Sequence, residues 1–342
     1  MKNPVPILTS LLVIQIAMAF GINYVETQRG IPSTEKLIKT NFGKIDKIVL
    51  EEKNSKLIIE KDKNNVWTLP GKFRFPAEPE AVSRLLDGFG NYTKGWPVAT
   101  TEDAAPRFRV ADNNFQEKIV LSAGGKDVDT YLIGSAAGFN KVHFRIGGHS
   151  EINSVELPAQ NASTNIEDWI DRKVLQVEPS DVITVELPQL KLVKKQKAFE
   201  LTSNGKTTIV DALTGGEVVD NACGVDVSEV LGVEDSPAYG LSAPAYTFTI
   251  TKKDGGKLTY TFGKLANSNF YVIKQPTGPF YLKIDAYFVD RLKDVVPGEL
   301  IAKSDRLRKM REKADKVLIE RTKGMQPVAP SEVSKPSDSA AK

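Results

Sequence analysis

Hydrophobic and polar residues follow three different patterns along the chain, and each predicts a different kind of structure. Residues 7–22 form an apolar run that only three polar residues interrupt. From Asp46 onward, short β-branched runs alternate with polar breaks, which is typical of antiparallel strands. Residues 300–323 are highly charged, with a narrow apolar stripe at Leu307, Met310, Ala314 and Val317 that predicts a helix. We therefore expect a leader, an α+β body and a charged helix.

The apolar run at residues 7–22 has two open interpretations. At a rise of 1.5 Å per residue, it covers most of a hydrocarbon core, and Tyr24 can complete the crossing in the interface. The favoured interpretation is therefore an uncleaved membrane anchor. A cleaved secretory signal is the alternative, because Ala17-Met18-Ala19 fits the small-x-small rule. A buried soluble helix would need a polar stripe, which this run lacks.

Charge predicts the orientation of this leader and argues against some functions. Lys2 and the amino terminus place positive charge on the short leading side, so we expect that side in the cytoplasm and the body exported. Cys223 is the only cysteine, which excludes an intrachain disulfide and a lipid anchor following the apolar run. Residues 299–323 carry nine basic and five acidic residues, which is a local net charge of +4. Because the net charge of the whole chain is +3, the rest of the chain carries about −1. We therefore expect no nucleic-acid binding.

The body begins with strand patterns and then changes period. After Pro79, apolar residues at Val82, Leu85, Leu86 and Phe89 recur at helical spacing, and Gly88 and Gly90 are expected to close that helix. Strand patterns return between residues 116 and 146. A short helix follows, with Thr164 or Asn165 as its cap and Trp169 facing inward.

After Glu178-Pro179 the same order of features begins again, which predicts an internal repeat. The matched features are Asp46 with Asp181, Trp67 with Phe199, the segment 108–111 with 239–244, Gly134 with Gly263, and WIDR at 169–172 with FVDR at 288–291. A second helix is expected around Val219, Cys223, Val227, Val230 and Leu231.

The predicted fold class is α+β, with two tandem modules of antiparallel sheet and one or two helices each, preceded by an N-terminal transmembrane helix. A chain of 342 residues, of which 41% are hydrophobic, can bury two such cores. The residues from 325 onward are dominated by Pro, Ser, Ala and Lys and cannot bury enough surface to fold alone. The expected organisation is an anchor at 1–25, a stalk at 26–43, modules at 44–177 and 178–298, a charged helix at 299–323 and a disordered tail at 324–342.

The order of these segments resembles a known family. KIDKIVLEE, VWTLP, a helix opened by Pro, YGLSAP with TFTITKKDGGKLTYTFG, and a closing (W/F)-(I/V)-D-R segment together are similar to the family called domain of unknown function 4340. The resemblance covers roughly residues 44–296, although FRVADN in the first module lacks the Gly and the Pro of YGLSAP. It implies a bacterial inner-membrane protein with one membrane pass and a periplasmic body, beside ABC-type export or gliding-type systems. It transfers no catalytic residues.

Histidines and the cysteine are the first candidates for chemistry. His143, His149 and Glu151 could suggest a metal site, but zinc requires three or four converging ligands, so we expect surface histidines. Cys223 lies on the apolar face of a predicted helix without a visible base, so we expect it to be buried.

Glycine pairs and lysines allow a functional and a structural interpretation. The pairs at 124–125, 147–148, 215–216 and 255–256 lack the spacing of a phosphate loop, so we expect hairpin turns. Lysines 191, 194, 195 and 197 could bind nucleic acid or lipid headgroups, but we expect an edge strand kept soluble by lysine.

Recurring and aromatic residues complete the candidates. The Asp-Arg pairs at 171–172 and 290–291 recur in both modules, which favours a structural task such as helix capping or an ion pair.

Seven aromatic residues gather at the ends of the modules. We expect most of them to lie in the core, and an exposed subset could contact a protein. The group comprises Trp96, Phe270, Tyr271, Phe280, Tyr281, Tyr287 and Phe288.

The leading hypothesis is a non-enzymatic accessory or scaffold subunit of an envelope complex. We assign no catalytic, cofactor-binding or metal residue and no cofactor. The expected partners are the membrane, through the N-terminal helix, and other envelope proteins, in particular integral membrane subunits. The alternative is a periplasmic small-molecule or peptide binding module that uses a cleft between the repeats. An envelope hydrolase is the least favoured, since no catalytic set emerges.

Overall fold

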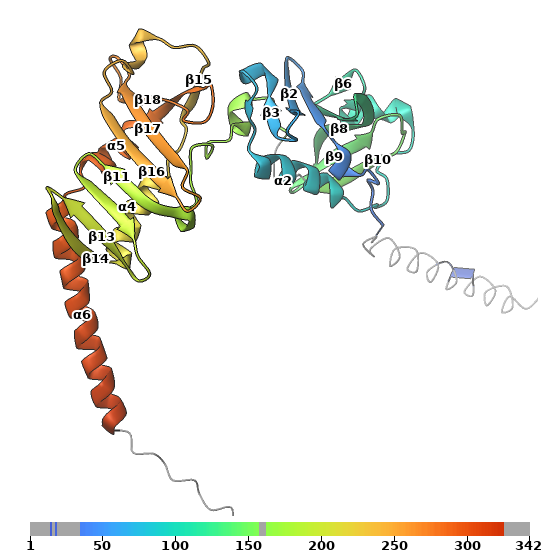
Figure 1. Cartoon of the computed structure of the whole chain (residues 1–342). Helices are drawn as coiled ribbons and strands as arrows, with labels where there is room; N and C mark the ends of the chain where they lie inside the picture. The colour runs from blue at the N-terminus through green and yellow to red at the C-terminus, as the bar shows by residue number, and fades with distance from the viewer. Residues whose placement is uncertain (1–13, 16–17, 19–34, 157–161, 325–342) are drawn as a thin grey trace, which may run out of the picture. The chain divides into compact units, whose positions relative to one another are not determined.

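The computed structural model describes residues 14, 15, 18, 35–156 and 162–324, which form two compact units (Figure 1). The first unit comprises the described residues up to Val174 together with Asp226–Asp235 and Pro279–Lys283. The second comprises Leu175–Val225, Ser236–Gly278 and the described residues from Ile284 onward. The expected tail at 325–342 lies outside the described residues.

The expected membrane anchor also lies outside the described residues, apart from Ile14, Gln15 and Met18. Over the ranges that the structure describes, none of the helices combines the length and the apolar character needed to cross a bilayer.

The first unit is built on an antiparallel sheet with the strand order β10-β9-β8-β7-β1-β2-β3-β4. Its central strand, β1, pairs with β2 on one side and with β7 on the other. The strands are β1 (Lys47–Glu52), β2 (Ser55–Lys61), β3 (Trp67–Leu69), β4 (Phe75–Pro76), β7 (Glu117–Ala123), β8 (Lys126–Gly138), β9 (Lys141–Ile146) and β10 (Ile152–Glu156), and a separate hairpin is formed by β5 (Val110–Ala111) and β6 (Asn114–Phe115).

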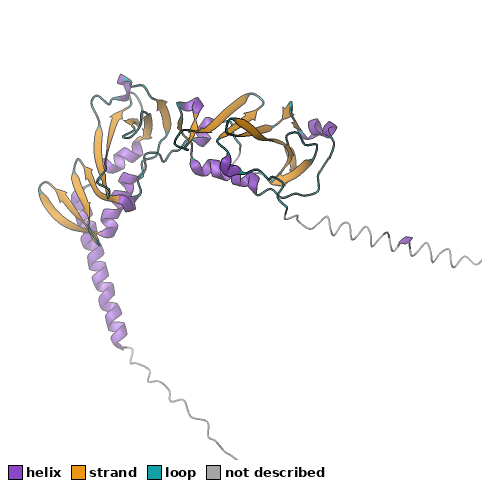
Figure 2. Cartoon of the chain, turned by 45° about the vertical axis from the view of Figure 1, so that its right-hand side comes forward, coloured by secondary structure: helices purple, strands orange, loops and turns teal. Residues whose placement is uncertain are grey.

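Helix α2 (Pro79–Gly90) covers one face of this sheet (Figure 2). Its predicted apolar stripe is confirmed, because Val82, Leu85, Leu86 and Phe89 are all buried. The ring of Phe89 lies 5.0 Å from that of Tyr131 on β8. The short helices of this unit are η1 (Phe42–Lys44), η2 (Pro70–Lys72), η3 (Glu102–Ala104), α3 (Ala105–Phe108) and η4 (Ile166–Trp169).

The second unit repeats this strand order. Its strands follow each other as β14-β13-β12-β11-β16-β17-β18, and β11 lies between β12 and β16 as β1 lies between β2 and β7. Helix α4 follows β14 as α2 follows β4. The prediction of two similar antiparallel modules is therefore confirmed. The elements are η5 (Pro179–Asp181), β11 (Val182–Leu187), β12 (Leu190–Lys194), β13 (Ala198–Ser203), β14 (Lys206–Asp211), α4 (Ala212–Cys223), η6 (Pro237–Tyr239), β16 (Tyr246–Lys252), β17 (Lys257–Lys264), β18 (Phe270–Lys274), α5 (Ala286–Lys293) and α6 (Pro297–Gly324).

The second predicted helix lies earlier than expected. The side chain of Asp211 accepts hydrogen bonds from the backbone N–H groups of Leu213 and Thr214, so this N-cap starts α4 at Ala212. Gly224 ends the helix. The expected helical residues Val230 and Leu231 belong instead to β15 (Glu229–Gly232), which pairs with β19 (Tyr281–Asp285).

Two expectations about turns and edges are wrong. Gly215 and Gly216 lie inside α4 rather than in a hairpin, and the reason at Gly215 is close packing on Phe199. The glycine pairs at 124–125, 147–148 and 255–256 do lie between strands, with positive φ at Gly124, Gly125, Gly148 and Gly255. The lysine-rich strand β12 is an interior strand between β11 and β13. Its lysines face solvent, and Lys191 lies 2.8 Å from Glu186 on β11.

Helix α6 packs on the second unit only along its first part (Figure 1). Ser304 is 5% exposed, and its hydroxyl accepts a hydrogen bond of 2.8 Å from the backbone N–H of Asp211. Lys303 pairs with Glu217 on α4. Every side chain at residues 308–320 is exposed.

Candidate functional site

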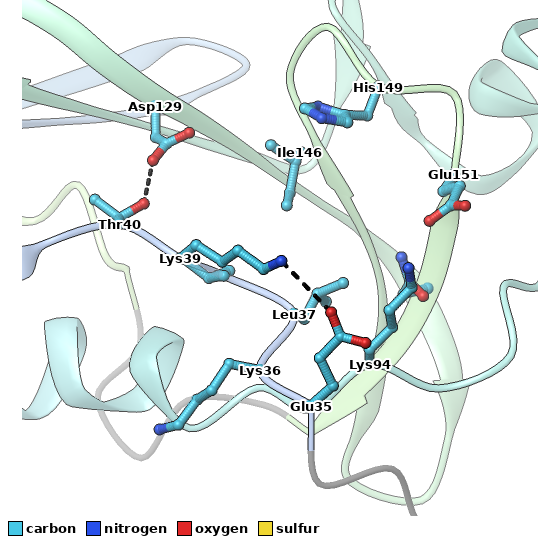
Figure 3. A pocket seen from close by; sticks show the side chains of 12 residues that line it. Glu35, Lys36, Leu37, Lys39, Thr40, Lys94, Asp129, Ile146, His149 and Glu151 are labelled. Atoms are coloured by element: carbon cyan, nitrogen blue, oxygen red, sulfur yellow. Dashed lines mark hydrogen bonds and ion pairs between the residues drawn. The ribbon is translucent and has the colours of Figure 1, made fainter.

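A pocket of about 420 Å³ lies in the first unit, between residues 35–40 and the ends of strands β8, β9 and β10 (Figure 3). Three stretches that are distant in sequence line it: residues 35–40, Lys94, and a third stretch between Asp129 and Asn153. Its volume is in the range of small-molecule sites. This pocket is the candidate site because it combines unpaired charged groups with a buried unpaired amide.

The chain at residues 35–40 is held in place by an isolated antiparallel β-bridge between Lys36 and Thr93. The backbone N–H of Leu37 donates to the carbonyl of Tyr92 over 2.8 Å, and that of Lys94 donates to the carbonyl of Glu35 over 2.7 Å. Ile38 is 5% exposed. The sequence places this segment in the stalk, because it lacks the β-branched alternation of the body. In the structure it belongs to the first unit and forms one wall of the pocket.

Polar contacts fix the far end of that wall. Thr40 donates a hydrogen bond from its hydroxyl to Asp129, and the same hydroxyl lies 2.9 Å from the phenol oxygen of Tyr131. Burial raises the pKa of Tyr131, so its phenol stays protonated at neutral pH. The Thr40–Asp129 contact closes this end of the pocket in Figure 3.

The turn that forms the opposite wall is fixed by a buried arginine. Arg145 on β9 donates to the carbonyl of Val110 from Nε over 2.6 Å and to the carbonyl of His149 from Nη1 over 3.0 Å. Its Nη2 lies 2.6 Å from Asp112. The guanidinium therefore uses its fork geometry to position the turn that carries His149 and Glu151.

Two charged groups of the pocket are unpaired. Neither the ammonium of Lys94 nor the carboxylate of Glu151 has a hydrogen-bond or ion-pair partner in the part of the chain that the structure describes. Lys39 forms a 3.5 Å pair with Glu35, in which both side chains are largely exposed. Such exposed pairs contribute about 1 kcal/mol or less.

Apolar groups and one amide line the rest of the pocket. Leu37 and Ile146 are half-buried, and Figure 3 shows their side chains at the centre of the pocket. Asn153 on β10 is 5% exposed, and its Oδ1 has no hydrogen-bond partner among the described residues. A buried acceptor without a partner costs about 1–3 kcal/mol. The pocket can therefore bind a small group that offers opposite charges and a hydrogen-bond donor.

Of the candidate metal residues, the structure brings His149 and Glu151 to this pocket but not His143. His143 was expected at the surface, but it is 9% exposed. Its Nδ1 donates to the carbonyl of Ser135 over 2.8 Å, and its ring lies 4.5 Å from that of Phe108. Within the described ranges, no three His, Cys, Asp or Glu side chains are arranged to hold a metal ion.

Cys223 is buried as predicted, with 2% of its surface exposed. Burial raises the pKa of its thiol to about 12. A protonated thiol in this setting is a poor nucleophile.

The aspartates of the recurring Asp-Arg pairs make different contacts. Asp171 accepts a hydrogen bond of 2.9 Å from the backbone N–H of Lys173, which caps the turn that follows, whereas Asp290 lies inside α5 and accepts from the Tyr271 hydroxyl over 3.4 Å. Arg172 donates from Nη1 to the carbonyls of Val227 and Ser228, over 3.0 and 2.8 Å. In the second module, Arg291 donates to Asn221. Helix α5 is capped by Asp285, whose side chain accepts from the backbone N–H of Tyr287.

Of the seven grouped aromatic residues, most of which were expected in the core, three are buried, two are half-buried and two are exposed. Tyr271, Phe280 and Tyr281 are at most 8% exposed, and Phe270 and Phe288 are half-buried. The exposed subset comprises Trp96 and Tyr287, at 66% and 69%.

The second unit also has a hollow, of about 620 Å³, lined by Pro188, Pro244 and Pro297 among others. Three of its polar side chains already have partners. Gln189 donates to the carbonyl of Leu292 over 2.7 Å, and the Tyr246 hydroxyl donates to the same carbonyl over 3.2 Å. Lys293 donates to the hydroxyl of Tyr271 over 2.8 Å. This hollow therefore offers a ligand fewer unpaired polar groups than the pocket of the first unit.

The fold is that of a duplicated α+β protein with a pocket in its first unit. A family model described as Domain of unknown function (DUF4340) matches residues 67–244, slightly more than half of the chain, and the protein belongs to this family. The match runs from β3 to the residue before Ala245 and so includes parts of both modules. No curated protein and no solved structure matches the chain.

Proposed function

We propose that the protein is a non-enzymatic, membrane-anchored accessory or scaffold subunit of a bacterial envelope complex, with its body in the periplasm. An ABC-type transport system or a gliding-type system is the proposed setting. The observation that carries the proposal is the distal part of α6, because it is a long helix whose apolar stripe is not covered by its own unit.

The stripe of α6 has the spacing of a helix-helix contact. Leu307, Met310, Ala314 and Val317 follow each other at intervals of three, four and three residues, which is the spacing of a coiled-coil seam. Met310 is 66% exposed and Val317 is 51% exposed. A surface stripe of this kind supports docking of a partner helix.

The charges beside the stripe indicate the chemistry of that partner. Arg306, Arg311 and Lys313 occupy positions that flank the seam in heptad numbering. In a parallel pair of α6 helices, Arg306 of one copy would face Arg311 of the other, which disfavours self-association. The proposed partner is therefore an envelope protein that presents an apolar seam flanked by acidic residues, and integral membrane subunits are the expected class.

Membrane attachment is the second part of the proposal. The apolar run at residues 7–22 supports it, together with the positive charge at Lys2. A single span would place the body and α6 on the same side of the membrane as the periplasmic parts of integral subunits.

Site-specific photo-crosslinking in cells tests the proposal. A photoreactive residue at Met310 or Val317 should crosslink to one membrane protein, whereas the same residue at Glu312, on the opposite face of α6, should not. Met310→Asp combined with Val317→Asp should remove the partner from an affinity purification in mild detergent. Equal crosslinking from both faces, or recovery of a lone monomer under those conditions, would contradict the proposal.

A further inference from the structure

We infer that the pocket of the first unit binds a small zwitterionic ligand of the amino-acid or short-peptide class. This inference does not depend on the proposed role of α6, because the pocket and α6 lie in different units.

The unpaired charges define the two ends of the ligand. Lys94 offers an ammonium and Glu151 a carboxylate, and each lines the pocket without a partner among the described residues. A ligand carboxylate can pair with Lys94, and a ligand ammonium can pair with Glu151. Charge-assisted hydrogen bonds of this kind are the stronger class. A ligand with a single charge would leave one of the two protein groups unpaired.

The remaining surface of the pocket fits an amino-acid side chain and a peptide group. Leu37 and Ile146 provide apolar contact area between the charged groups (Figure 3). Asn153 is 95% buried, and the Oδ1 atom of its side-chain amide has no partner among the described residues. A peptide N–H of the ligand would be a suitable donor to this oxygen. Buried polar groups in native proteins almost always have a partner, so an orphan in a pocket wall indicates a missing one.

The structure also explains why the site is preformed. Arg145 fixes the turn that carries Glu151, and the paired backbone of Leu37 with Tyr92 and of Glu35 with Lys94 fixes the other wall. Preorganised walls reduce the ordering cost of binding.

Isothermal titration calorimetry on the full-length protein tests the inference with four probes. Free leucine and alanyl-leucine are zwitterions, whereas N-acetyl-alanyl-leucine lacks the ammonium and alanyl-leucine amide lacks the carboxylate. We expect at least one zwitterion to bind. Because Lys94 and Glu151 are exposed, each capped dipeptide should bind about threefold to fivefold more weakly than alanyl-leucine.

Variants assign the two ends of the ligand. Lys94→Gln should weaken binding of the zwitterion alanyl-leucine about threefold or more. It should change binding of alanyl-leucine amide little, because that probe has no carboxylate to pair with Lys94. Glu151→Gln should show the converse with N-acetyl-alanyl-leucine. Lys126→Gln and Glu102→Gln change exposed charges of the same unit outside the pocket and should bind as the wild type does.

Asn153→Leu separates binding from folding. The substitution removes an unpaired buried acceptor while roughly preserving volume, so the protein should remain folded while zwitterion binding weakens about threefold or more. Absence of binding by both zwitterions at millimolar concentration would overturn the inference. Equal binding of capped and uncapped dipeptides, or unchanged binding in both charge variants, would also overturn it.

Discussion

Gly134 on β8 and Gly263 on β17 serve the same purpose in the two modules. A Cβ atom at Gly134 would lie 2.1 Å from the carbonyl oxygen of Phe108, and one at Gly263 would lie 2.1 Å from that of Tyr239. In each module, a short helix precedes this contact and ends in a left-handed residue, Arg109 in the first and Gly240 in the second. The repeat therefore preserves a close approach of a loop to a strand, and glycine is required because no side chain fits.

Replacing either strand glycine should destabilise the protein. Gly263→Ala must displace the backbone at Tyr239, so we expect the free energy of unfolding to fall by about 2 kcal/mol or more. Urea denaturation measures this change. Gly95→Ala is the matched control, because no atom lies within 4 Å of its added Cβ. Equal stability of the two variants would refute the close approach.

The adjacent glycines of α4 should respond in opposite directions. A Cβ at Gly215 would lie 2.2 Å from the ring of Phe199, whereas one at Gly216 meets no atom within 4 Å. Gly215→Ala should therefore cost about 1–3 kcal/mol, and Gly216→Ala should stabilise by about 0.5–1 kcal/mol through helix propensity. Thermal unfolding of the two variants compares them directly. A shift of the same sign in both would show that α4 does not pack on β13 at Gly215.

The arginine beside the pocket should matter more than its acidic partner. Arg145→Met removes three contacts and leaves the carbonyl of Val110 without its donor, so we expect a loss of about 2–3 kcal/mol. The side chain of Asp112 is 76% exposed, so Asp112→Asn should cost about 1 kcal/mol or less. Chemical denaturation separates the two. A larger loss for Asp112→Asn would indicate that the ion pair, rather than the carbonyl contacts, fixes Arg145.

Glu117 should make the protein less stable as the pH rises. Burial raises its pKa, and Glu52 on the neighbouring strand raises it further. Because the folded pKa lies above the unfolded value of about 4.3, the folded state binds more protons between the two values, and stability falls as the pH rises through this window. Glu117→Gln should therefore be more stable than wild type at pH 7 and gain nothing at pH 3. Denaturation at both values checks this, with Glu102→Gln as the control for loss of a surface charge. An equal gain at both pH values would contradict the ionisation mechanism.

Cys223 should resist thiol reagents in the folded protein. It is 2% exposed, and its pKa is raised to about 12, so both access and thiolate fraction are low. Labelling with iodoacetamide should be at least about a hundredfold slower than for the urea-unfolded chain. Mass spectrometry measures the rate. Rapid labelling without denaturant would indicate local opening at the end of α4.

Much of the sheet and helix pattern could be predicted because it depends on local periodicity. The strands from Lys47 and the stripe of α2 have regular periods, and the repeat of Gly134 and Gly263 indicated duplication. Helix α4 was misplaced because Gly215 and Gly216 suggest a turn by propensity. Their positions in the helix are decided by packing against Phe199 and by the cap at Asp211.

The pocket could not be predicted from local pattern. Its lining combines residues 35–40 with Lys94 and Glu151, and the contacts that bring them together are between backbone groups distant in sequence. The polar segment 35–40 has no strand periodicity, so its burial at Ile38 depends on the surface that it meets. The sequence shows His149 and Glu151 close to each other along the chain. Only the fold shows that they line the same pocket as Lys94.

Residues far along the chain complete the first unit, and this imposes an order on biosynthesis. The ring of Phe280 packs edge-on against that of Phe75 at 4.9 Å, and Arg172 donates to carbonyls at residues 227 and 228. Although domains usually fold from the N-terminus during synthesis, this unit cannot close until the ribosome has released Lys283. A nascent chain or recombinant fragment that stops near residue 177 would leave Phe75 uncovered and require chaperone protection.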